Sequence, residues 1–348
     1  MESAQVSLNS SLPAVAAQVL APSAPMRAVL QSGYGGTEKL RAGMTPRPTP
    51  GPGEVLLRVH AAGIDRGTWH LMTGRPYLMR LMGFGFFTPK NPVLGHDLAG
   101  TVVAVGPEVT RFRVGDTVFG MGEGAFAEYA RADQNKLARP PRGYSFEEAA
   151  VLGISGSTAL GAVDRAEIKA GERVLVIGAS GGVGTYAVQL VKALGAHVTA
   201  VASAGKLDML RELGADAVLD YRTTDFADGA SRYDAILDIG GNTPLRRLRR
   251  AMTDHGRLVF VGGEQGGDFS AGFERQLLAF ALAPFVSQRF VMLANREHYS
   301  LLERLVAHCE AGELRPVVDR RVSLEEVPSA IADLAAGKVR GKIVVHVA

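Results

Sequence analysis

The sequence predicts an α/β protein in two parts, an all-β part followed by a parallel sheet covered by helices. From Met26 to about Ala138, short β-rich runs alternate with glycine and proline at a spacing typical of a barrel. From Glu172 to about Val261, strands alternate with helices, which is the pattern of βαβ units and a parallel sheet. With 348 residues, the chain is long enough for two domains that each bury a core.

The expected elements follow in order along the chain. The all-β part holds strands at 55–61, 100–105, 117–119 and 126–131. The pattern turns helical between residues 143 and 166. The strands of the parallel sheet are expected at 173–177, 198–202, 217–220, 235–238 and 257–261. A helix near 324–336 and a strand at 342–347 end the chain.

Composition and charge exclude several classes of protein. Hydrophobic residues make up 47% and charged residues 21%, as in folded globular chains. No apolar run approaches the roughly 18 residues that span a bilayer. The net charge of +3 is dispersed, and we interpret the arginine cluster at 246–250 as a solvated helix face. We therefore expect neither a nucleic acid nor a membrane as a partner.

Cysteine use and the N-terminus bear on the compartment. The single cysteine, Cys309, excludes intrachain disulfides and a cysteine-rich zinc lobe, and its apolar surroundings favour a buried thiol. Residues 1–25 carry no Lys or Arg, which fits neither a secretory signal nor a transit peptide. We expect a disordered extension there, or an upstream start codon with Met26 as the natural start, and a cytoplasmic protein.

The run GASGGVG at residues 178–184 is the most informative motif. It follows the apolar strand 174–177 and opens a helical pattern, and its spacing nearly matches the dinucleotide-binding fingerprint. Such a loop lets the backbone approach a diphosphate, which the unpaired N–H groups at the helix start then bind. An ordinary tight turn is the alternative. The residues expected to contact the cofactor here are Ala179, Ser180, Gly181, Gly182, Val183 and Gly184.

The next strand indicates which dinucleotide binds. An NAD site usually has an Asp or Glu about 20 residues after the glycines, and this chain has none there. Instead Ser203 can donate a hydrogen bond to a 2′-phosphate and Lys206 can neutralise it, while Tyr221 could cover the adenine or add a donor. We therefore predict NADPH as the cofactor. In the alternative interpretation, Lys206 is a solvated lysine at a helix start, with Asp208 partly cancelling its field.

Several ordered motifs are distributed along most of the chain. They are AAGIDRGTWHLMTGR (61–75), NPVLGHDLAGTVVAVGPEVTRFRVGDTVFG (91–120), AAVLGISGSTALGA (149–162), GASGGVGTYAVQLVKALGA (178–196), LRELGADAVLDY (210–221) and GKVRGKIVV (337–345). With these motifs, the chain from about Arg27 to Val347 resembles the medium-chain dehydrogenase/reductase superfamily, and within it the zinc-independent quinone oxidoreductase branch.

The resemblance implies a GroES-like barrel domain and a doubly wound Rossmann domain, with the active site in the cleft between them. We expect the boundaries at 26–150 for the barrel, 151–290 for the Rossmann domain and 291–348 for a C-terminal return that completes the barrel domain. It also implies further cofactor contacts at Thr158, Gly262, Gly263 and Lys342, and a homodimer. The apolar stretch 273–286 could form the dimer contact or a pocket lid.

The chain departs from the zinc-dependent members of this superfamily at the metal ligands. Those enzymes hold zinc with a cysteine, a histidine and a second cysteine or equivalent. Here the corresponding positions hold Asp65, His96 and Ile154, and isoleucine cannot bind a metal. We therefore expect no metal unless Asp97 completes the set, and we interpret His96 as a hydrogen-bonded histidine at a barrel turn.

Without a metal, the substrate has to delocalise the negative charge itself, as a quinone or an α,β-unsaturated carbonyl does. Asp65 could orient the nicotinamide carboxamide or, if protonated, donate to a carbonyl oxygen; capping the helix begun near Thr68 is the alternative. Trp69 and Tyr77 lie in a segment, 69–87, rich in aromatic residues and methionine, which could roof a planar substrate or simply pack in the core.

The predicted function is thus NADPH-dependent reduction of a quinone or enone, with Asp65, Trp69 and Tyr77 as candidate catalytic residues. Two alternatives stay open. One is an alcohol or aldehyde dehydrogenase that recruits a metal through Asp65, His96 and Asp97. The other is a catalytically silent NADPH-binding sensor.

Overall fold

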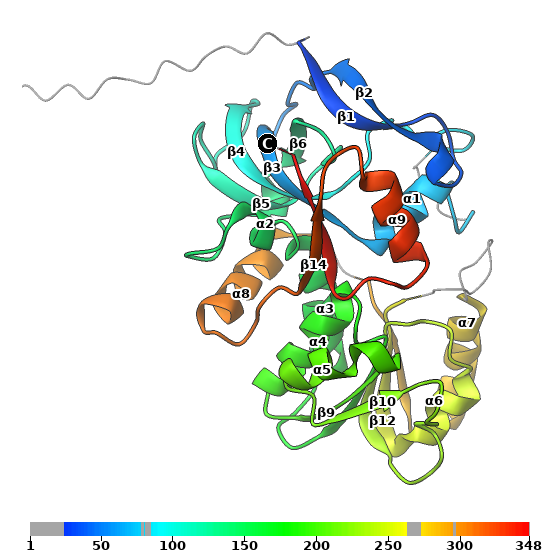
Figure 1. Cartoon of the computed structure of the whole chain (residues 1–348). Coiled ribbons are helices and arrows are strands. Elements are labelled where there is room, and N and C mark those ends of the chain that lie inside the picture. Colours follow the sequence, from blue (N-terminus) through cyan, green and yellow to red (C-terminus); the bar gives the residue numbers. More distant parts are fainter. Residues whose placement is uncertain (1–23, 78–79, 81–84, 263–272, 295–296, 348) are drawn as a thin grey trace, which may run out of the picture.

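The computed structural model describes residues 24–77, 80, 85–262, 273–294 and 297–347. The predicted cofactor contact Gly263, part of the aromatic and methionine-rich segment 69–87, and nearly all of the extension 1–25 lie outside these residues. Two lobes make up the chain, a β-rich one above and a layered α/β one below in Figure 1.

A six-stranded parallel sheet forms the centre of the lower lobe. Its order, β10-β9-β8-β11-β12-β13, is that of a doubly wound dinucleotide-binding fold. The strands are β8 (Arg173–Ile177), β9 (His197–Ala202), β10 (Ala217–Asp220), β11 (Tyr233–Asp238), β12 (Met252–Phe260) and β13 (Arg289–Met292). The predicted α/β class is therefore confirmed, and β13 runs across the domain boundary expected at residue 290.

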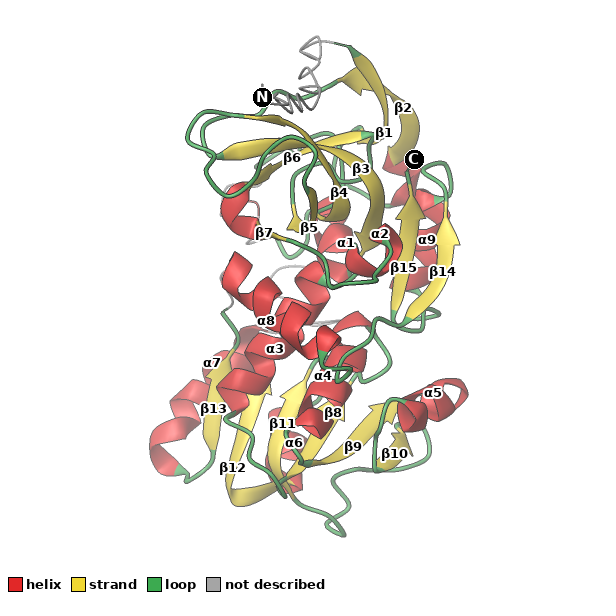
Figure 2. Ribbon diagram, turned by 90° about the vertical axis from the view of Figure 1, so that its left-hand side faces the viewer, coloured by secondary structure: helices red, strands yellow, loops and turns green. Residues whose placement is uncertain are grey.

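Helices cover both faces of this sheet, as Figure 2 shows. Alternate residues of the buried strands point to opposite faces of the sheet. Val174 and Val176 pack with helices α3 (Gly153–Ala166) and α4 (Gly182–Ala193), while Leu175 and Ile177 pack on the other side. The helices of the lower lobe and the connection are α3 (Gly153–Ala166), α4 (Gly182–Ala193), α5 (Leu207–Glu212), α6 (Leu245–Ala251), α7 (Phe273–Leu282) and α8 (Tyr299–Glu310).

The upper lobe is a curled seven-stranded sheet with an added hairpin. The sheet runs β14-β15-β3-β4-β5-β7, with β6 also paired to β3, and β1 pairs with β2. Its strands are β1 (Pro25–Gln31), β2 (Leu40–Pro46), β3 (Glu54–Ile64), β4 (Asp97–Val105), β5 (Thr117–Met121), β6 (Tyr129–Asp133), β7 (Leu137–Ala138), β14 (Val318–Val322) and β15 (Lys342–His346). The upper lobe also contains three helices, α1 (Arg66–Thr73), α2 (Phe146–Ala149) and α9 (Val327–Ala335).

The C-terminal segment returns to the upper lobe, as the resemblance implied. Strand β15 pairs antiparallel with β3, placing Ile343 opposite Ile64. The same segment touches the lower lobe just before β15 begins, through a parallel bridge between Gly341 and Gly181. The chain thus ties its two lobes together next to the glycine-rich loop, where the predicted site residues lie.

Candidate active site

The glycine-rich loop joins β8 to α4 and fits a diphosphate. Gly178 has a φ of +81°, and a Cβ on Gly184 would lie 2.3 Å from the Gly178 carbonyl oxygen, so neither position accepts a larger residue without strain. Gly181 caps α4 without a side-chain hydrogen bond. Across the described residues, the N–H groups of Gly182, Val183 and Gly184 have no acceptor. They offer three aligned donors at a helix N-terminus, which is where phosphate groups bind.

The C-terminal return braces this loop. The Gly341 N–H donates to the Ser180 carbonyl oxygen at 2.9 Å. The aliphatic stem of Lys342 lies against α4, because a Cβ on Gly182 would come within 2.7 Å of Lys342 Cδ. Ala179 and Ser180 are buried beneath it, so the loop is held from both lobes.

A buried ion pair anchors that brace. Lys342 Nζ lies 2.9 Å from Asp97 Oδ2 and 3.2 Å from Ser155 Oγ, and the two charged side chains are 2% and 0% exposed. Asp97 Oδ1 accepts a further hydrogen bond from the Ile154 N–H at 2.6 Å. Burial raises the pKa of Asp97 to about 6, an effect that the Lys342 charge opposes and that Asp65 reinforces.

The sequence interpretation missed this pair, because it considered Asp97 only as a possible metal ligand and Lys342 only as a cofactor contact. The two residues are 245 positions apart. A usable signal was present, since Asp97 opens a strand whose other residues are apolar except for Thr101, and a buried carboxylate requires a partner.

Asp65 lies beside Asp97, at the end of β3. Its Oδ1 accepts a hydrogen bond from the Thr68 N–H at 2.8 Å, so the helix begins at Arg66 and Asp65 is its N-cap. Asp65 therefore caps the helix through its Oδ1 atom, as the alternative interpretation of this residue expected. The other, Oδ2, is buried and has no hydrogen-bond partner within the described chain, which leaves it available for a ligand.

Among the described residues, no side-chain hydrogen bond or ring contact joins Asp65 to Trp69 or Tyr77, the other two candidate catalytic residues. Trp69 is half-buried against the barrel core, with the Arg66 guanidinium 4.6 Å from its ring. Tyr77 is 40% exposed, and Arg80 lies over its ring at 4.8 Å. Trp69 thus packs against the barrel core, and Phe86 and Phe87, farther along the segment, are exposed.

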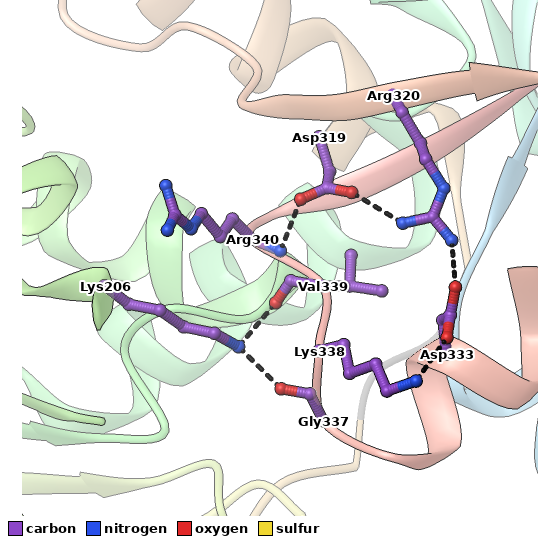
Figure 3. Close-up of polar contacts among 8 residues, drawn as sticks. All are labelled: Lys206, Asp319, Arg320, Asp333, Gly337, Lys338, Val339 and Arg340. Atoms are coloured by element: carbon purple, nitrogen blue, oxygen red, sulfur yellow. Dashed lines mark hydrogen bonds and ion pairs between the residues drawn. The ribbon is translucent and has the colours of Figure 1, made fainter. Parts of the chain in front are cut away.

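The predicted ribose site lies at the carboxyl end of β9. Ser203 follows the strand directly and is half-buried. Tyr221 is 53% exposed, and its N–H donates to the Ala202 carbonyl oxygen at 3.2 Å. Lys206 Nζ donates to the carbonyl oxygens of Gly337 and Val339, at 2.8 and 2.6 Å. The ammonium is thus held by the return rather than freely solvated, as Figure 3 shows.

The remaining predicted contacts lie close to the loop or at neighbouring strand ends. Thr158 sits on α3, where its hydroxyl donates to the Ile154 carbonyl oxygen at 2.7 Å. Gly262 follows β12, and a Cβ there would lie 2.1 Å from the Ile239 carbonyl oxygen, so glycine is required for the close approach of two strand ends.

The metal-ligand positions lack a complete donor set. Nδ1 of His96 lies 3.0 Å from the Gly122 carbonyl oxygen, which can only accept, so Nδ1 carries the proton. This hydrogen bond is the one expected of a histidine at a barrel turn. Among residues that the structure describes, no three His, Cys, Asp or Glu side chains gather in a way that could hold a metal ion.

Comparisons with known proteins agree with this arrangement. Residues 51–142 match the alcohol dehydrogenase GroES-like domain, and residues 213–345 match a family model described as zinc-binding dehydrogenase. The chain is 33% identical to the chloroplastic quinone-oxidoreductase QR1 of Triphysaria versicolor, over 92% of this chain and 98% of that protein. The chain belongs to the medium-chain dehydrogenase/reductase superfamily, in its quinone oxidoreductase-like branch.

The chain is also similar to a second named reductase and to a solved quinone oxidoreductase structure. The chain is 31% identical to 2-methylene-furan-3-one reductase of Solanum lycopersicum, covering 74% of this chain and 64% of that protein. The solved quinone oxidoreductase of Coxiella burnetii superposes with a TM-score of 0.81 at 26% identity, over 93% of this chain and all of that one. The protein is therefore an oxidoreductase, and its fold supports a nicotinamide cofactor.

The structure also bears on membrane association. No described helix has both the length and the apolar character needed to cross a bilayer.

Proposed function

We propose that this protein is an NADPH-dependent reductase that transfers a hydride to a quinone or an α,β-unsaturated carbonyl without zinc. The observation that carries the proposal is the set of unpartnered N–H groups at Gly182, Val183 and Gly184, braced by the return and close to the buried Asp65–Asp97 pair. When bound, a reduced nicotinamide supplies the hydride. The protein's residues would bind and orient the two reactants and exclude water.

The choice of acceptor follows from the residues at the metal-ligand positions. With Ile154 in place of a ligand and Asp97 committed to Lys342, Asp65 and His96 are too few to activate a simple carbonyl through zinc. Quinones and enones spread the added charge over several atoms, so they need less electrostatic help. Two relatives support these substrate classes: one is named a quinone oxidoreductase, QR1, and the other 2-methylene-furan-3-one reductase.

Asp65 is the proposed polar contact in the site. Its unpartnered Oδ2 could accept a hydrogen bond from the nicotinamide carboxamide or, with a proton on it, donate one to the substrate carbonyl. The neighbouring Asp97 is committed to Lys342 and to the Ile154 N–H, so among the described residues Asp65 Oδ2 is the oxygen of these two side chains that has no partner.

A metal-assisted dehydrogenase is the second candidate, and the same unpartnered Oδ2 favours it because carboxylate oxygen is a zinc ligand. The family model described as zinc-binding dehydrogenase matches residues 213–345, which include none of Asp65, His96 and Asp97. Zinc content that rises and falls with activity would support this candidate over the first.

The test is a panel of acceptors followed by the loss of reduced-nicotinamide absorbance. We expect turnover with quinones or enones, and faster turnover with NADPH than with NADH at low cofactor concentration. Turnover with simple aldehydes alone would favour the metal-assisted dehydrogenase. Binding of NADPH with no turnover on any acceptor would favour the silent sensor.

We also propose a homodimer and a cytoplasmic location. Strand β13 is the outer strand of the parallel sheet, and the adjoining segment exposes Leu277, Leu278, Phe280 and Phe285. A second copy of this chain would cover that apolar surface. Light scattering on the full chain tests the dimer, and Leu278→Lys should yield monomer if this surface forms the contact.

A further inference from the structure

Arg340 is a charged side chain without a partner beside Lys206. Its main-chain N–H donates to Asp319 Oδ1 at 3.0 Å, but within the described chain its guanidinium makes no hydrogen bond or ion pair. The side chain is exposed. Burial lowers the pKa of Lys206, the Asp319 charge opposes this effect, and the Arg340 charge adds to it. Figure 3 shows both side chains on the same side of the return segment, with Lys206 reaching it from the lower lobe and Arg340 extending from it.

The other charges of this segment neutralise one another. Arg320 bridges Asp319 and Asp333 at 2.8 and 2.7 Å, and Lys338 lies 3.1 Å from Asp333. Lys206 and Arg340 are left as neighbouring cations whose side chains contact no carboxylate among the described residues. Two neighbouring like charges repel each other, and an anion bound by both would offset the repulsion.

Lys206 alone is a limited ligand for a phosphate group. An ammonium has three donors, and the Gly337 and Val339 carbonyl oxygens already take two of them. One donor is left for a bound anion. The planar guanidinium of Arg340 offers a fork of donors that matches two phosphate oxygens, so the two side chains together would provide three hydrogen bonds.

The position of this pair indicates which phosphate it would meet. Lys206 follows the carboxyl end of β9, the strand adjacent to β8, and the loop after β8 is the diphosphate site. In a doubly wound fold the adenosine ribose lies at the end of this second strand. A phosphate monoester on that ribose would therefore approach Lys206 and Arg340.

We propose that Arg340 is a specificity-determining residue that binds the 2′-phosphate of NADPH together with Lys206. The inference rests on the proposed NADPH-dependent function. It adds that the upper lobe contributes to the choice of cofactor, because Arg340 belongs to the return and is adjacent to Gly341, which bridges to Gly181. Discrimination between NADPH and NADH would then require the two lobes to be correctly apposed.

Calorimetric binding of NADPH and NADH to the full chain tests this inference. In Arg340→Gln, we expect NADPH to bind about 10- to 100-fold more weakly, the range for hydrogen bonds to a charged group, with NADH affinity unchanged. Arg340→Lys should recover part of the loss. The matched control is Lys338→Gln, which removes one exposed positive charge two positions away and should change NADPH affinity less than about threefold.

The outcomes separate this inference from the function on which it rests. If the parent prefers NADPH but Arg340→Gln behaves like Lys338→Gln, Arg340 has no such role and the proposed function survives. Equal weakening of NADPH and NADH by Arg340→Gln would assign it a structural role and overturn the inference. If the parent binds NADH as tightly as NADPH, or binds neither, the NADPH-dependent function fails and the inference with it.

Discussion

Removing the ammonium of Lys342 should destabilise the protein strongly. Lys342→Met keeps a stem of similar length against Gly182 but leaves the fully buried Asp97 carboxylate with only the Ile154 N–H as partner. Loss of one partner from a buried ion pair typically costs about 3–5 kcal/mol, because the remaining charge is not solvated. Asp97→Asn should cost a comparable amount, since it leaves the Lys342 ammonium buried with only Ser155 Oγ.

The double variant distinguishes a coupled pair from two independent contacts. With both charges removed, Asp97→Asn/Lys342→Met should be less destabilised than the sum of the single variants by at least about 1 kcal/mol. The control is Lys338→Met, whose side chain is 69% exposed beside Asp333 and whose loss should cost no more than about 1 kcal/mol.

Urea unfolding followed by tryptophan fluorescence suits this measurement. Trp69 is the only tryptophan and lies in the upper lobe, so its emission reports the lobe that holds Asp97. The two lobes need not unfold in one step, and circular dichroism should be recorded alongside. If Lys342→Met loses no more stability than Lys338→Met, or if the two single effects add, the pair does not stabilise the fold as argued.

Three further predictions concern the cofactor and the substrate. Gly182→Asp should abolish NADPH binding, because its Cβ would contact Lys342 and its negative charge would repel the diphosphate. Gly182→Asn, which adds similar bulk without the charge, should retain weak binding. Equal calorimetric affinities of the two variants for NADPH would exclude the charge effect. Lys206→Ala should remove most of the preference for NADPH over NADH, and an unchanged ratio of dissociation constants would contradict this. In the parent, burial lowers the pKa of Lys206, so its positive charge is lost at a lower pH than that of an ordinary lysine. The preference for NADPH should accordingly decline at a pH below about 10, where an ordinary lysine still keeps most of its charge, and a ratio that stays flat up to that pH would argue against Lys206 as a phosphate ligand.

The sequence predicted the fold and the cofactor loop because both depend on local patterns. Periodicity located the strands of the parallel sheet closely, and glycine spacing placed the expected cofactor loop at the junction of a strand and a helix, where the structure has β8 and α4. Element boundaries were less accurate where side chains decide them. The helix expected near Thr68 begins at Arg66, because Asp65 caps it, and the strand expected from Phe126 begins at Tyr129.

Contacts between distant segments could not be predicted in this way. The Asp97–Lys342 pair joins residues far apart in the chain, and nothing local indicates that a lysine in the closing strand is buried. The same holds for Lys206, whose two carbonyl partners come from the return. Both contacts depend on how β15 reaches β3, which is a property of the tertiary fold.

The most direct test of the proposed chemistry is NADPH oxidation by chelator-treated protein whose zinc content has been measured as negligible. Our account predicts that such protein reduces quinones or enones as fast as untreated protein and that added zinc has no effect. Loss of activity on chelation, recovered by stoichiometric zinc, would contradict it.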